Sequence, residues 1–152
     1  MNLTVRQTPF AELIGAPTFD ALIKEYACYS AIDGMPEPKP HMESYHMLDR
    51  SGLMTTFCAY VKDELIGFAL LLVNILPHYS VLVANLESFF VAEKHRGTGA
   101  GLQLFLLAED VARKRGAVGM LLAAAVNGQL DRILARRKSY RKSHNAYFRS
   151  LA

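Results

Sequence analysis

A chain of 152 residues is long enough to bury a hydrophobic core and short of room for a second domain, so we expect one domain over residues 1–152. Hydrophobic residues make up 51% of the chain and charged residues 20%, values that are ordinary for a globular protein and exclude a disordered one. The longest apolar stretch is interrupted by Asn74, Pro77 and His78, so no segment is predicted to span a membrane.

The net charge of +3 comes largely from a basic segment near the end of the chain. Its cations are Arg132, Arg136, Arg137, Lys138, Arg141, Lys142 and Arg149. Such a segment either attracts a phosphorylated ligand or a nucleic acid, or forms the solvated face of a helix. Its aromatic residues form no stacking platform and no reading helix is evident, so we do not expect nucleic-acid binding.

The two cysteines, Cys28 and Cys58, lie far apart and have no Cys or His neighbours at metal-ligand spacing. The sequence therefore predicts neither a metal site nor a disulfide framework, and the simplest inference is a reducing, cytoplasmic setting. Cys28 falls within the apolar stripe of a predicted helix, where we expect it to be buried and inert.

Helical spacing of apolar residues predicts a helix over residues 19–30 and a second, short helix over residues 42–50. Residues 31–41 between them contain a glycine and three prolines, so they are expected to be irregular. The period then changes to that of β-strands, over residues 55–61, 66–76 and 81–91. Short connections between these strands predict an antiparallel meander.

Helical spacing returns after Gly101 and ends near Arg115. A strand over residues 118–126, a helix over residues 129–138 and a short closing strand over residues 145–151 complete the prediction. The fold class is mixed α/β (α+β), with a strand, a loop and a long helix following the meander.

Between the third predicted strand and the long helix lies a loop nearly bare of side chains, Arg96-Gly97-Thr98-Gly99-Ala100-Gly101. Unpaired amide groups and partial positive charge at a helix N-terminus suit an anion, and glycines let phosphate oxygens approach the backbone. The loop lacks the GxxxxGK[ST] spacing of a P-loop and the GxGxxG spacing of a dinucleotide-binding turn.

This hexapeptide fits the [RQ]xxGx[GA] signature of the Gcn5-related N-acetyltransferases (GNAT), and the order of elements resembles that family from about Thr4 to Leu151. The resemblance implies a mixed sheet with helices on both faces and a loop whose amides bind the pyrophosphate of acetyl-coenzyme A. Residues implied to contact the coenzyme are Phe89, Phe90, Val91, Arg96, Gly97, Thr98, Gly99, Ala100, Gly101, Leu102 and Asn127. Phe89 and Phe90 could equally be core residues, and Asn127 could simply end a strand.

Acetyl transfer to an amine needs a base for the amine proton and a proton for the departing thiolate. Relatives often have an acid where Glu87 stands, so the resemblance implies that Glu87 is the base or positions a water molecule. Among Leu86, Phe89 and Phe90 we expect this carboxyl to lose hydration, which would raise its pKa. The open alternative is an edge carboxylate paired with a basic group.

The general acid is less clear, because Ala135 stands where many relatives have a tyrosine. Tyr140, Ser139 or a water molecule could supply the proton, and Tyr140 could instead be a packing residue. Residues with a possible place at the acceptor are His41, His46, Tyr29, Asp33 and Glu43, although surface positions explain them as well.

The sequence thus predicts an acetyl-coenzyme A dependent N-acetyltransferase acting on a small-molecule or peptide amine by direct transfer, without a metal. The alternative is a catalytically weak acyl-coenzyme A binding module, a sensor or structural partner, which the departure at Ala135 favours. Relatives often form dimers, and no feature of the sequence decides whether this chain does. The sequence leaves the acceptor open, because one scaffold serves many amines.

Overall fold

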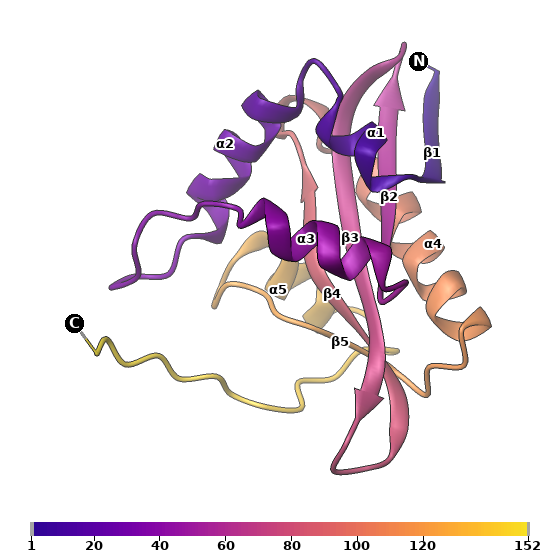
Figure 1. Ribbon diagram of the computed structural model, residues 1–152. Coiled ribbons are helices and arrows are strands. Elements are labelled where there is room, and N and C mark those ends of the chain that lie inside the picture. The colour runs from indigo at the N-terminus through magenta and orange to yellow at the C-terminus, as the bar shows by residue number, and fades with distance from the viewer. Residues whose placement is uncertain (1, 152) are drawn as a thin grey trace.

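The computed structural model describes residues 2–151 and contains a five-stranded sheet (Figure 1). Its strands, β1 to β5, lie side by side in chain order, with β1 to β4 antiparallel and β5 parallel to β4. They span Leu3–Thr8, Met54–Val61, Glu64–Leu76, Val81–Val91 and Met120–Leu122. The predicted meander is therefore confirmed, as is the mixed α/β class.

Helices cover both faces of this sheet (Figure 1). On one face lie α1 (Phe10–Ile14), α2 (Phe19–Ser30) and α3 (Met42–Arg50), and on the other lies α4 (Ala100–Lys114). A 3-10 turn, η1 (Glu93–His95), precedes α4, and α5 (Gln129–Ala135) follows β5. None of the helices within residues 2–151 is long and apolar enough to cross a bilayer.

The central strands are apolar on both sides because each face meets a helical layer. Phe57 and Ala69 pack in the cluster that includes α4, whereas Cys58 and Phe68 pack under α1 to α3. Leu104 of α4 is fully buried. Burial of a leucine side chain stabilises a fold by about 1.5–3 kcal/mol, so the apolar stripe fixes α4 against the sheet.

The N-terminal end of the fold was missed from the sequence. Residues 3–8 mix polar and apolar side chains, and α1 is only five residues long, so neither shows a strong period. β1 owes its conformation to six consecutive pairs with β2. Tertiary pairing, rather than local propensity, therefore adds this edge strand.

The C-terminal end of the described chain contains less regular structure than was predicted. Only Met120–Leu122 of the expected strand 118–126 is a strand, and α5 ends at Ala135 rather than 138. The predicted closing strand over residues 145–151 is wrong, since no helix or strand follows α5 in the described residues. The side chains of this segment are exposed, so no burial offsets the conformational entropy that ordering it as a strand would cost.

Candidate functional site

An open sheet edge begins where β4 and β5 diverge. The two strands pair only between Ala84–Leu86 and Met120–Leu122, yet β4 continues to Val91. At the same point the register of β4 against β3 shifts by one residue, leaving Glu87 as a β-bulge. A bulge of this kind re-aims the residues around it and often lies beside a functional site.

The backbone of β4 beyond the bulge presents polar groups to this open edge. Ala92 donates its amide to Ile66 of β3, 2.9 Å away, and in an antiparallel ladder alternate residues face opposite sides. The amides and carbonyls of Phe89 and Val91 therefore face away from β3, where an extended ligand could pair with them. This is the geometry that the resemblance implies for the pantetheine arm.

The aromatic side chains of this segment pack within the protein. Phe89 lies edge-on to Phe105 of α4, with ring centres 5.9 Å apart, whereas Phe90 packs between the tyrosines of α2 on the opposite face. Their side chains are thus core or near-core residues, as the sequence allowed. Their backbone is what the open edge exposes.

The glycine loop joins η1 to α4 and contains two residues with left-handed backbone. Gly97 and Gly99 both have φ of 88°, and Gly99 is the N-cap of α4. This region costs other L-residues roughly 1–2 kcal/mol, so the sequence requires glycine here. Within residues 2–151 no hydrogen bond occupies the amides of Gly97, Gly99, Gly101 and Leu102. Together they form an exposed set of donors at a helix N-terminus.

Arg96, expected at the phosphates, contacts the protein itself. Its guanidinium carbon lies 4.3 Å from the ring centre of Tyr29 and 5.5 Å from that of Phe90. Its Nε donates to the Val91 carbonyl at 3.2 Å, and a terminal nitrogen donates to Gln129 at 3.4 Å. The side chain therefore bridges α2, β4 and α5.

Glu87 lies on the α2–α3 face of the bulge, and its expected burial is wrong. The residue is exposed, because the bulge turns it out of the apolar layer while Leu86 stays buried. Tyr45 of α3 donates a hydrogen bond to Glu87 Oε1 at 3.0 Å, and the Ser88 hydroxyl donates to Oε2. Two hydroxyls thus orient a carboxylate beside the open edge.

Tyr45 and Tyr26 are functional candidates that the sequence analysis missed. Burial, with the Glu87 charge adding to it, raises the pKa of Tyr45 to about 12. Burial likewise raises the pKa of Tyr26, which interacts with Ser88. Both phenols keep their protons at neutral pH and can donate. The available signal was the position of Tyr45 in the short helix beside the irregular loop.

The sequence matches the Acetyltransferase (GNAT) family over residues 19–137. The chain belongs to the GNAT family of acetyltransferases. The matched segment contains the bulge, the glycine loop and α4, and the family uses acetyl-coenzyme A. No significant match to a curated protein was found.

Solved structures with this GNAT fold cover nearly the whole chain at low identity. An aminoglycoside acetyltransferase, meta-AAC0020, from an uncultured soil metagenomic sample has a TM-score of 0.74 at 15% identity, covering 99% of this chain and 97% of its own. A ribosomal-protein-alanine N-acetyltransferase from Brucella melitensis biovar Abortus 2308 has a TM-score of 0.73 at 18% identity, covering 99% and 100%.

A third structure is AAC(6′)-Iy in complex with the bisubstrate analogue CoA-S-monomethyl-acetylneamine. Its TM-score is 0.73 at 17% identity, covering 100% of this chain and 99% of its own. At these identities the three likenesses establish the GNAT fold.

The remaining coenzyme and acid candidates, Asn127 and Tyr140, lie in the part of the chain that follows β5. Asn127 is exposed in the loop after β5, with a φ of 59° and its amide bonded to Asp131. The Tyr140 ring packs 5.3 Å from that of Phe105, and its hydroxyl donates to Glu109 of α4. Burial raises the pKa of Tyr140, and the hydrogen bond to Glu109 raises it further. In these contacts Tyr140 is a packing residue.

The two histidines near the predicted acceptor side have structural contacts. His41 caps α3 by accepting the Ser44 amide, and the His46 ring lies edge-on to Phe10 at 5.4 Å. Asp33 and Glu43 are exposed on the irregular loop and on α3. The expected burial of Cys28 is wrong, since this thiol is exposed near the end of α2.

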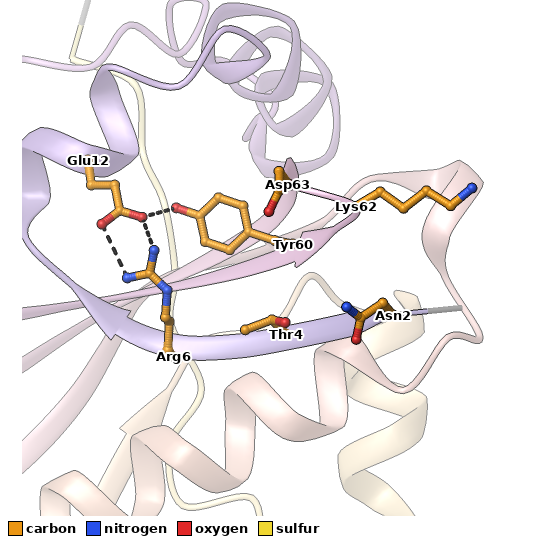
Figure 2. Close-up of a pocket in the computed structure, with 7 residues that line it drawn as sticks. All are labelled: Asn2, Thr4, Arg6, Glu12, Tyr60, Lys62 and Asp63. Carbon is orange, nitrogen blue, oxygen red and sulfur yellow. Dashed lines mark hydrogen bonds and ion pairs between the residues drawn. The ribbon is translucent and has the colours of Figure 1, made fainter.

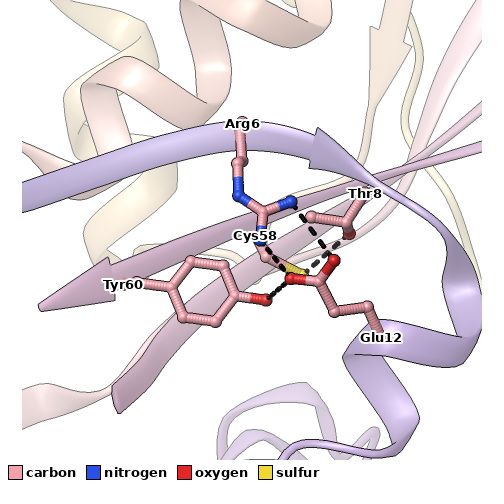
Figure 3. A network of polar contacts seen from close by, with 5 residues as sticks. All are labelled: Arg6, Thr8, Glu12, Cys58 and Tyr60. Atoms are coloured by element: carbon pink, nitrogen blue, oxygen red, sulfur yellow. Dashed lines mark hydrogen bonds and ion pairs between the residues drawn. The ribbon is translucent and has the colours of Figure 1, made fainter. Parts of the chain in front are cut away.

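A separate cavity of about 340 Å³ lies at the β1–β2 edge, away from the glycine loop (Figure 2). Its lining residues are Asn2, Thr4, Arg6, Glu12, Tyr60, Lys62 and Asp63. Figure 3 shows its polar contacts: Arg6 forms an ion pair with Glu12, and the Tyr60 hydroxyl donates to the same carboxylate at 2.7 Å. These groups satisfy one another, so the network fastens α1 to the sheet.

Proposed function

We propose that residues 1–152 form one N-acetyltransferase domain that moves the acetyl group of acetyl-coenzyme A directly to a primary amine. The single observation that carries this proposal is the set of exposed amides at the start of α4, beside the open edge of β4. An anion held there would leave an extended arm free to run along β4 toward the bulge. Family membership supports the same reading.

In this proposal the segment Arg96–Leu102 holds the pyrophosphate through the backbone, and the backbones of Phe89 and Val91 pair with the pantetheine arm. The bound coenzyme supplies a thioester. Asn127, exposed on the loop after β5, is proposed to contact the coenzyme as well. Within the loop, the donors that stay unbonded in the described residues are the amides of Gly97, Gly99, Gly101 and Leu102.

Glu87 is the proposed base, directly or through a water molecule. Hydrogen bonds from Tyr45 and Ser88 fix its carboxylate and occupy one lone pair on each oxygen, so each oxygen keeps a second lone pair that can accept a proton from an incoming ammonium group. Its exposure fits a base that accepts a proton from a solvated ammonium group. Loss of that proton lets the nitrogen attack the thioester carbonyl.

The departing thiolate needs a proton, for which Tyr45 is the better-placed tyrosine. Its phenol stays protonated well above neutral pH and is hydrogen-bonded to Glu87, so a proton that it gives to the thiolate can be replaced by the one that Glu87 takes from the acceptor. The Tyr140 hydroxyl is instead bonded to Glu109 on the α4 side, so Tyr140 is the second candidate. Replacement of each by phenylalanine separates them.

The acceptor is proposed to be a small-molecule or peptide amine, in keeping with the aminoglycoside and ribosomal-protein acetyltransferases of the same fold. The alternative, an acyl-coenzyme A binding module with little activity, draws support from Ala135 at the usual tyrosine position. A screen of amines for release of free coenzyme A from acetyl-coenzyme A tests the proposal. Coenzyme binding without thiol release for any amine, with Glu87→Gln indistinguishable from wild type, would favour the binding module.

A further inference from the structure

The last two turns of α2 contact the turn that precedes the glycine loop. Glu25 accepts the main-chain amide of Glu93 at 2.7 Å, and the Tyr29 hydroxyl donates to the Glu93 carboxylate at 2.9 Å. These partners are separated by more than sixty residues of sequence. Two bonds to one residue, one through its backbone and one through its side chain, fix the position of η1.

Arg96 extends this contact to the loop itself. Its guanidinium lies over the Tyr29 ring at 4.3 Å, while its Nε–H bonds to the Val91 carbonyl at the end of β4. A planar guanidinium can stack on a ring and donate in its own plane at once, which a lysine ammonium cannot reproduce. The start of the loop is therefore held between α2 and β4.

We infer that Glu25, Tyr29 and Arg96 are positioning residues that set the glycine loop for the pyrophosphate, with Arg96 acting through its stack and its bond to Val91 rather than as a phosphate ligand. The inference rests on the proposed coenzyme site. Free amides bind an anion well only if they already converge, because ordering a loop on binding costs affinity. The contact of α2 supplies that order before the ligand arrives.

Two substitutions of Tyr29 test the contact, because the residue is 46% exposed and its packing on Phe90 is kept by phenylalanine and kept in part by leucine. Tyr29→Leu removes both the stack and the hydroxyl bond, and we expect the Kd for coenzyme A to rise about tenfold. Tyr29→Phe keeps the ring and should raise Kd about threefold. The matched control is Tyr79→Leu, at a 68% exposed tyrosine of the β3–β4 turn, where we expect no change.

Substitutions of Arg96 separate positioning from direct phosphate binding. A phosphate ligand would be replaced well by lysine, which keeps the point charge, whereas a stacked bridge would not. We therefore expect Arg96→Lys and Arg96→Met to weaken coenzyme A binding to a similar extent. A wild-type Kd for Arg96→Lys would overturn the positioning role.

The second readout is amide hydrogen exchange of residues 93–101 in the ligand-free variants, measured by mass spectrometry. We expect Tyr29→Leu and Glu25→Gln to speed exchange here while the protection of β3 and α4 stays unchanged. Weaker binding with unaltered exchange, or faster exchange with an unaltered Kd, would overturn the inference. If wild-type protein binds no coenzyme A, the proposed function fails, and exchange alone still reports whether α2 orders the loop.

Discussion

Gly99 provides a sharp test of the coenzyme loop, because its backbone conformation disfavours other residues although the space around it would admit a side chain. Its φ of 88° is a region that alanine reaches at a cost of roughly 1–2 kcal/mol. No heavy atom lies within 4 Å of the position that a Cβ would take, so the cost is strain rather than collision. Since 1 kcal/mol shifts the Tm of a domain this size by about 2–4 °C, Gly99→Ala should melt a few degrees lower.

The same substitution should weaken coenzyme A binding about tenfold, because the loop relieves the strain by turning its amides away from the anion. Gly101→Ala is the matched control. Its Cβ would meet Phe89 at 3.5 Å, an ordinary contact, and alanine favours a helix over glycine by about 0.5–1 kcal/mol. Calorimetric titration and thermal melting should therefore show a Kd for Gly101→Ala within about twofold of wild type, with an equal or higher Tm. Equal binding by both variants would refute the role of the Gly99 backbone.

Three further predictions concern the carboxylates and tyrosines. Glu87→Gln should lower kcat by about 100-fold or more, as loss of a general base does, while the Kd for coenzyme A measured by calorimetry stays unchanged. Tyr45→Phe should lower kcat more than Tyr140→Phe, and the reverse order in steady-state assays would transfer the acid role to Tyr140. Hydrogen bonds from Arg6, the larger effect, and from Tyr60 hold the pKa of Glu12 below its ordinary value of 4.5. The ionised Glu12 therefore stabilises the fold fully above pH 4.5, and this stabilisation is lost as the pH falls through the lower pKa of the folded state. In denaturant titrations the stability gap between wild type and Glu12→Gln should accordingly narrow below about pH 4.5, and a gap constant with pH would contradict this linkage.

The loop and its flanking elements were predictable because local sequence dictates them. Gly97 and Gly99 are required by backbone conformation, and the stripe of α4 by helical period, so both were visible without tertiary information. The strand over residues 81–91 was also predicted with its observed bounds. In these segments local preference and tertiary packing agree.

The β-bulge at Glu87 was not predictable, because it exists only as a shift in pairing with β3. The apolar sequence neighbours of Glu87, namely Leu86, Phe89 and Phe90, led to the wrong expectation that the carboxyl loses hydration. Tyr45 was missed for a related reason: its contact with Glu87 joins residues 42 positions apart. The pattern of residues along one segment contains no information on its register with another strand or on its contacts with distant segments.

The bulge also brings the proposed coenzyme-binding backbone of β4 next to the proposed base, Glu87. Leu86 and Phe89 face the α4 layer, whereas Glu87 and Ser88 turn together toward α2 and α3. A regular strand would place one of these two polar residues under α4, where neither tyrosine of the opposite layer could reach it. The extra residue therefore lets one strand present its backbone to a ligand at the open edge and a hydrogen-bonded carboxylate to the helical side, within the length of a few residues.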